Sequence, residues 1–96
     1  MIYRIVKLHF QTTKTASFLE LFNQVVTKVN EQPGCIEMYM MQDIHNPAIF
    51  ITHSKWEKEE DLNNYRNSEL FKTIWPTIKP WFEQKAEAWS MQLVTN

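Results

Sequence analysis

The hydrophobic positions of the chain follow two periodic patterns. In some stretches they alternate, which predicts strands, and in others they recur every three to four residues, which predicts helices. A helix is expected over Thr15–Glu31, whose apolar residues form one stripe; Ser17, with Glu20 after it, or Thr15 would cap it, and Pro33-Gly34 would end it. Strands are expected where β-branched and aromatic residues alternate or gather, at Ile2–Phe10, Cys35–Asp43, Ala48–Trp56 and Lys85–Val94.

A second helical region is expected between the last two strands. Glu57–Tyr65 reads as a short charged helix, and Asn67-Ser68 offers a cap for another helix that begins near Glu69. That helix runs into residues 70–82, LFKTIWPTIKPWF, which contain two prolines. Because proline lacks a backbone N–H and clashes with the preceding turn, the stretch predicts a broken helix with large aromatic rings at the breaks.

The order of these elements is β-α-β-β-α-β, which is the ferredoxin-like arrangement of an antiparallel sheet with its helices on one face. The class is therefore α+β, and residues 1–96 form a single domain. Side chains alternate along a strand, so each predicted strand can be divided between the two faces of the sheet. Both faces receive large apolar residues, and the one that the helices leave uncovered would carry Tyr39, Ile49, Ile51, Trp89, Met91 and Leu93. Such a patch predicts a two-fold homodimer, with two sheets packed face to face.

Composition narrows the possible classes of function. The net charge is −1 with mixed signs along the chain, which argues against nucleic acid as a partner. No apolar run approaches the ~20 residues of a membrane span, so no membrane partner is expected. One cysteine, Cys35, fits a reducing cytoplasm, and the three histidines lack the spacing of metal ligands. The single glycine, Gly34, excludes glycine-rich phosphate loops.

Aromatic residues suggest a slot for a flat ligand between the sheet and the helices. Trp56, Phe50 and Thr52 alternate onto the same side of their strand, the side expected to face the helices. Further aromatic side chains would roof this region from the helices, namely Tyr65, Phe71, Trp75 and Trp81. These residues could line a pocket for a small aromatic or hydrophobic ligand. The alternative is that they pack together as an ordinary core.

The third strand ends in ITHSKW, an acidic helix start EKEEDL follows, and then YRNSELFK. With this topology, nearly the whole chain resembles the antibiotic biosynthesis monooxygenase family, whose members form dimeric α+β barrels. The resemblance implies oxygenation of a quinol- or anthrone-like compound with O2 and without a metal or flavin cofactor, and it matches Trp56 to the family's tryptophan. Some anthrone oxygenases have an asparagine where this chain has Thr52. Haem-degrading relatives have a histidine where Trp75 stands and an asparagine in strand one, which is absent here.

Oxygenation without a cofactor requires a dry cavity, a base or anion stabiliser, and orientation of the substrate. His9 and His53 are candidate bases, although their parity places them on the dimer-facing side and polar contacts in the interface are the alternative. Tyr65 and Arg66 are candidates to orient a substrate oxygen near Trp56. Two hypotheses remain open: a monooxygenase, and a non-catalytic dimeric module that binds a hydrophobic ligand.

Overall fold

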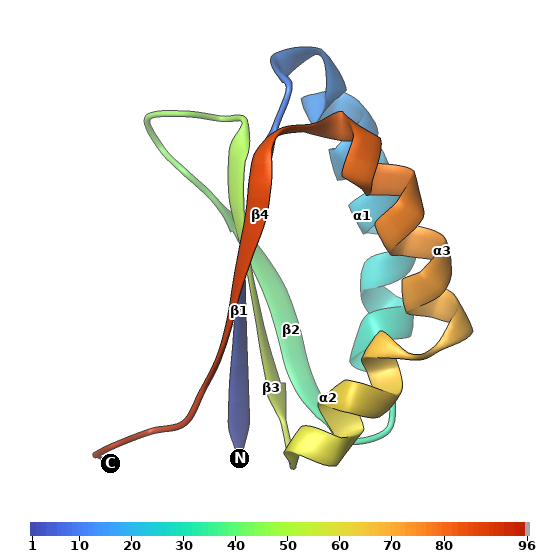
Figure 1. Cartoon of the computed structure of the whole chain (residues 1–96), viewed down its shortest axis with the longest axis vertical. Coiled ribbons are helices and arrows are strands. Elements are labelled where there is room, and N and C mark those ends of the chain that lie inside the picture. Colours follow the sequence, from blue (N-terminus) through green and yellow to red (C-terminus); the bar gives the residue numbers. More distant parts are fainter. Residues whose placement is uncertain (96) are drawn as a thin grey trace.

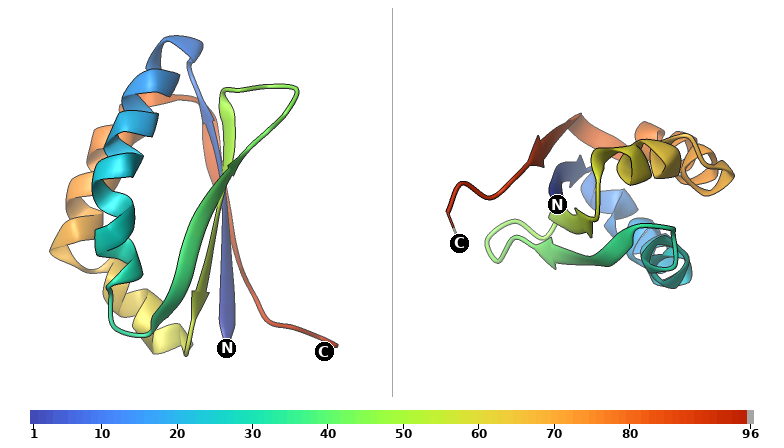
Figure 2. Two further views of the ribbon diagram at one scale, coloured as in Figure 1. Left: turned by 180° about the vertical axis from the view of Figure 1, so that it is seen from behind. Right: turned by 90° about the horizontal axis from the view of Figure 1, so that it is seen from below.

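The computed structural model describes residues 1–95, and it has the ferredoxin-like α+β fold. Its strands are β1 (Ile2–Phe10), β2 (Cys35–Gln42), β3 (Ile49–Trp56) and β4 (Phe82–Met91). The α-helices are α1 (Thr15–Asn30), α2 (Glu59–Arg66) and α3 (Glu69–Ile78), and short 3-10 turns η1 (Thr12–Lys14) and η2 (Lys79–Trp81) flank α1 and α3. The strands form one antiparallel sheet in the order β2-β3-β1-β4. All helices lie on one side of it (Figures 1 and 2).

Strand pairing confirms which side chains face the helices. Trp56 pairs with Ile2 and Phe50 with Leu8, so the register places Phe50 and Trp56 on the helix side, where both are fully buried. The opposite parity, which includes Ile51 and His53, lies on the face without helices. A bulge near the start of β2 shifts the expected alternation there: Cys35 pairs with Trp56, and Ile36 is 44% exposed.

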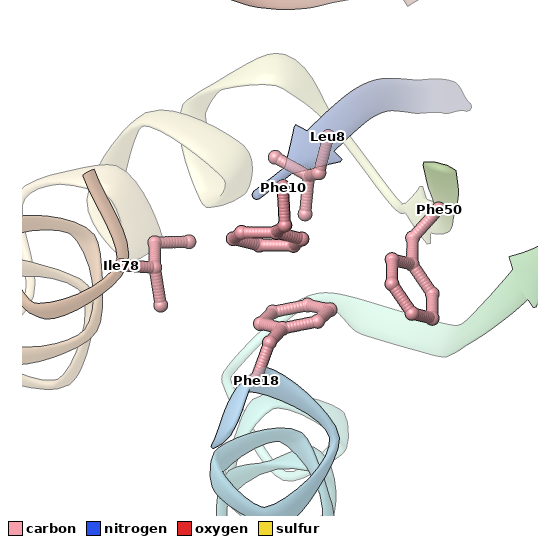
Figure 3. Packing of buried hydrophobic residues seen from close by; sticks show 5 residues of the cluster. All are labelled: Leu8, Phe10, Phe18, Phe50 and Ile78. Carbon is pink, nitrogen blue, oxygen red and sulfur yellow. The ribbon is translucent and has the colours of Figure 1, made fainter. Parts of the chain in front are cut away.

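The core is a cluster of aromatic and aliphatic side chains from both layers. Phe10 of β1 and Phe18 of α1 have ring centroids only 4.2 Å apart, and Phe50 meets Phe18 edge-on at 5.2 Å. Leu8 and Ile78 complete the buried cluster, with Ile78 reaching it from the end of α3 (Figure 3). This cluster fixes one end of the helices against the sheet.

The prediction of a helix broken at both prolines was wrong for Pro76, which lies inside α3. Proline removes the hydrogen bond to the carbonyl of Lys72, and because Pro76 and Lys72 are both exposed, water can satisfy that carbonyl. The helix does stop before Pro80, which lies in the η2 turn. Ser68 caps α3 as expected, its hydroxyl accepting from the Phe71 N–H at 3.2 Å.

The helix cap of α1 and several element boundaries also differ from the sequence expectation; for example, α2 begins at Glu59 rather than Glu57. Lys14, without a side-chain hydrogen bond, stands at the N-cap of α1, so neither Thr15 nor Ser17 caps this helix. The last strand begins at Phe82 rather than Lys85, because Phe10 pairs with Phe82 and their rings lie 5.1 Å apart. It ends at Met91, which pairs with Tyr3 near the beginning of β1. Leu93 therefore lies beyond the strand.

Candidate functional site

A cavity of about 330 Å³ lies between the sheet and the helices, at the small end of the ~300–1,000 Å³ typical of ligand pockets. Its lining is mostly apolar and comes from both layers. The sheet contributes Val6, Leu8, Met38, Ala86 and Ala88. The helices contribute Phe18, Leu21, Phe22, Val25, Val29, Leu62, Phe71, Ile74, Trp75 and Ile78. Ala86 and Ala88 are small side chains facing large ones, and this difference in size leaves room for a ligand.

The polar lining residues gather toward one end of the cavity. They are Arg4, Thr52, Ser54, Tyr65 and Arg66. The register explains why: Arg4 lies opposite Ser54, near the start of β1 and the end of β3, and α2 follows β3 directly. The other end is formed by the apolar residues around Leu8 and Ile78. A ligand with an apolar body and a polar head therefore matches the lining.

Aromatic side chains form a continuous series, of which Tyr65, Phe71 and Trp75 line the cavity. Trp56 stacks on Tyr65 at 5.3 Å, and Tyr65 meets Phe71 edge-on at 5.3 Å. Phe71 stacks in turn on Trp75, with centroids 5.8 Å apart and planes 10° from parallel. Phe71 and Trp75 lie one turn apart on α3, and Tyr65 joins them from the last turn of α2. Flat rings at the wall suit a flat aromatic ligand.

Tyr65 supplies a hydroxyl group that stays protonated at neutral pH. Its burial, and to a smaller extent the nearby Cys35, raise the pKa of Tyr65 to about 12. The side chain can therefore donate a hydrogen bond to a ligand oxygen, and it cannot act as a general base at neutral pH. Burial, followed by the charge of Glu37, also raises the pKa of the Cys35 thiol.

Arg4 and Arg66 bring two positive charges to the polar end. The Arg4 guanidinium donates from Nη1 to the Ser90 hydroxyl at 3.0 Å. Burial lowers the pKa of Arg4, and the charge of Arg66 lowers it further. Arg66 is exposed in the last turn of α2, where a positive charge interacts favourably with the helix dipole.

The structure brings together some of the residues that the sequence suggested. Thr52, Tyr65, Arg66, Phe71 and Trp75 all line the cavity. Trp56 and Phe50 do not line the cavity; both are fully buried, and the Trp56 Nε1 donates to the Ser54 hydroxyl at 2.9 Å. Trp81 packs against the core cluster instead.

His9 and His53 do not reach the cavity, because their strand parity places them on the other face of the sheet. His53 stacks on Tyr39 at 4.8 Å and lies 5.8 Å from the ring of Tyr3. His9 borders a separate surface depression near Asn46 and Glu83. The described lining of the main cavity contains no histidine, aspartate or glutamate.

Sequence reasoning missed Arg4, Ser54 and the two alanines of β4. Arg4 could have been found, because it shares its strand parity with Val6, Leu8 and Phe10, and a charged residue in such a row indicates a special environment. The alanines gave a weaker signal, since the empty volume beside them depends on how far the helices stand from the sheet. Within residues 1–95, no three His, Cys, Asp or Glu side chains group as metal ligands, and no helix is long and apolar enough to span a membrane.

Solved structures with this fold are numerous. A crystal structure of an antibiotic biosynthesis monooxygenase matches with a TM-score of 0.93 at 21% identity, covering 99% of this chain and 100% of that one. A conserved protein from Methanosarcina mazei matches with a TM-score of 0.89 at 24% identity, covering 96% of this chain and 92% of that one. A protein from Mycobacterium tuberculosis reaches 0.91 at only 8% identity, covering 99% and 96%. At these identities the likeness establishes the fold.

Comparison with curated proteins gives no match. The sequence model of one family, described as antibiotic biosynthesis monooxygenase, matches residues 1–75, which include β1 to β3, α2 and most of α3. This match covers most of the chain and includes all the polar residues of the cavity lining, namely Arg4, Thr52, Ser54, Tyr65 and Arg66. The chain therefore belongs to the antibiotic biosynthesis monooxygenase family.

Proposed function

We propose that this protein is a cofactor-independent monooxygenase that oxidises a small quinol- or anthrone-like aromatic compound with O2. The observation that carries the proposal is the apolar cavity with one polar end, in a chain that belongs to a family named for monooxygenases. Its volume of about 330 Å³ suits a molecule of a few fused rings. Phe71 and Trp75 would lie against the rings of that molecule.

The reaction fits a site without a resident redox group. An electron-rich ring carrying an oxyanion can give electrons to O2 directly, and an activated ring methylene then becomes a carbonyl, with one molecule of O2 consumed and one molecule of water released. The carbon is oxidised, one oxygen atom forms the carbonyl, and the other leaves as water with the two hydrogens of the methylene. The protein's task is to hold the ring in a dry cavity and to stabilise its oxyanion.

The described lining offers no histidine or carboxylate as a base. We therefore propose that the substrate loses its proton before or during entry, and that the protein selects the anion. Tyr65, protonated because burial raises its pKa to about 12, would donate a hydrogen bond to the substrate oxygen. Thr52, which also lines the cavity, would hold a second oxygen. His9 and His53 have no place in this mechanism because they lie on the other face.

The alternative is a non-catalytic dimeric module that binds a hydrophobic ligand in the same cavity. The lack of a base among the described lining residues favours it, since binding requires only the apolar walls and the polar end. The two functions share the site and differ in whether O2 is consumed.

We further propose a homodimer formed through the face of the sheet that the helices leave uncovered (Figure 1). This face exposes Tyr39 (44%), Met41 (51%), Trp89 (40%) and Met91 (49%), and apolar side chains gathered on one face are typical of an interaction surface. The compartment we propose is the cytoplasm, because the one cysteine suits reducing conditions.

The experiment is O2 uptake by the purified, metal-stripped protein with a panel of anthrones and quinols. The test variant is Ala86→Leu, which fills the cavity from β4, and the matched control is Ala16→Leu, on the exposed side of α1. Uptake above the uncatalysed rate, lost in Ala86→Leu and retained in Ala16→Leu, would support the oxygenase. The binding module would be favoured if the wild type consumed no O2 with any compound but bound one of them, and if Ala86→Leu abolished that binding.

A further inference from the structure

We propose that Arg4 and Arg66 together form a binding site for an anionic oxygen, so that the ligand of the cavity is a planar aromatic acid in its ionised form. This inference rests on the proposed function only in taking the cavity as the ligand site. It narrows the substrate class from aromatic compounds in general to those that carry a carboxylate or a ring oxyanion.

The two arginines reach the same cavity from different layers of the fold. Arg4 projects from β1 on the helix-facing side, and Arg66 comes from the last turn of α2. Two like charges at one site repel each other, and the described lining contains no carboxylate to offset them. Such an arrangement is unfavourable when empty and becomes favourable when an anion binds between or beside the two guanidinium groups.

Arg4 lines the cavity and has guanidinium N–H groups that are not used in its one hydrogen bond. Its Nη1 donates to Ser90, the residue that pairs with it across β1 and β4. A guanidinium has five N–H donors in a planar fork, so one hydrogen bond leaves others for a ligand. Its pKa is lowered by burial and by Arg66, both of which disfavour the charged form. A bound anion would oppose these effects and stabilise that form.

Neutral hydroxyl groups complete the polar end. The Ser54 oxygen accepts the Trp56 N–H, which leaves the Ser54 O–H free to donate into the cavity. Tyr65 stays protonated to high pH and can donate as well. An anionic oxygen would thus meet charged and neutral donors, while its rings would meet the apolar wall of Phe71, Ile74 and Trp75.

The first test compares 1-naphthoate with 1-naphthamide, which has a similar shape and no charge, by calorimetric titration of the full chain. We expect the carboxylate to bind about tenfold more tightly, because a hydrogen bond between charged groups is stronger than one to a neutral amide. Arg66→Gln, and separately Arg4→Gln, should weaken naphthoate about tenfold and change naphthamide by less than about twofold. Because Arg66 is exposed, Arg66→Gln should keep the fold, which circular dichroism can verify.

The matched control is Lys28→Gln, which removes one exposed positive charge on α1 away from the lining. It should change the affinity of neither probe. Equal affinity for the two probes, binding of neither, an equal loss of both in the arginine variants, or the same loss of naphthoate in Lys28→Gln would overturn the proposal.

A second probe separates ring oxyanions from carboxylates. 4-Nitrophenol turns yellow when it ionises, so its absorbance reports its protonation state when bound. A tenfold preference for the phenolate would lower the pH of its ionisation by about one unit, and Arg66→Gln should remove that shift. A shift with 4-nitrophenol identifies the ring oxyanion as a ligand, and naphthoate selectivity alone identifies the carboxylate. Either effect supports the anion site, and the absence of both would overturn it.

These probes do not need to react with O2, so the result is independent of turnover. A protein that consumes O2 without preferring anions would retain the oxygenase activity and would lose both this inference and the proposed selection of the anion. A protein that prefers anions without consuming O2 would retain the inference and lose the oxygenase.

Discussion

The indole Nε1 of Trp56 donates a hydrogen bond to the Ser54 hydroxyl at 2.9 Å, and both side chains are buried. The two residues are neighbours on the same face of β3, and they differ in what they reach. Ser54 lines the cavity, whereas Trp56 lies behind it and stacks on Tyr65. We therefore propose that Trp56 acts on the candidate site through Ser54 and Tyr65, as a positioning residue.

Replacing Trp56 by phenylalanine should destabilise the protein by about 2–4 kcal/mol, because a cavity forms and Ser54 loses its donor. Ser54→Ala should cost about 1–3 kcal/mol, because the indole N–H is left unpaired. The double variant should be destabilised by about 1 kcal/mol less than the sum of the two single destabilisations, since the hydrogen bond is lost only once. Urea unfolding of the four proteins checks this, and strict additivity would contradict the coupling.

Stability should fall at high pH through Tyr65. Its folded pKa is raised to about 12 from an ordinary 10, so the phenol loses its proton first in the unfolded chain. The contribution of Tyr65 to the free energy of unfolding is therefore fully present below pH 10. It is lost as the pH rises toward 12, up to a total of about 3 kcal/mol. The stability of Tyr65→Phe, measured by urea unfolding from pH 9 to 12, should decline less steeply than that of the wild type. Parallel curves for the two proteins would argue against the raised pKa.

Gly34 should tolerate no side chain. Its φ is +81°, in the left-handed region that favours glycine, and an added Cβ would overlap the carboxylate of Asp61 on α2. Gly34→Ala should therefore destabilise the fold by about 2–4 kcal/mol, from backbone strain and overpacking together. Adding Asp61→Ala should recover only part of the packing loss, because the Cβ of residue 61 would still meet the added side chain, and it should leave the backbone strain. Thermal unfolding measures both variants, and an unchanged melting temperature in Gly34→Ala would contradict the close approach.

The proposed dimer should depend on Trp89, which is 40% exposed on the uncovered face of the sheet. Because the monomer gains little from this exposed side chain, Trp89→Glu should keep the fold and weaken association about 100-fold, as expected for a tryptophan at the centre of an interface. The matched control is Leu19→Glu, at a 36% exposed position on α1. Light scattering across a concentration series distinguishes the outcomes, and equal effects of the two substitutions, or a monomeric wild type, would argue against this interface.

The sequence by itself determined the order of elements and the faces of the sheet. Strict alternation in β3 placed Phe50 and Trp56 toward the helices and His53 away from them, since a strand has a period of two and each face demands its own kind of side chain. Ser68 indicated the start of α3 through its local hydrogen bond to Phe71. Both signals depend on neighbours in the chain, and they can be read without the rest of the molecule.

Only the tertiary structure decided which of these residues form the site. Trp56 and Tyr65 look equivalent as aromatic candidates, yet one is sealed in the core and the other lines the cavity, because the cavity exists where Ala86 and Ala88 stand opposite the helices. The pairing of Arg4 with Arg66 likewise joins residues that are far apart in sequence and meet only when β1 and α2 enclose the same space. A volume between layers and a repulsion between distant charges depend on how the layers pack, and no local pattern specifies them.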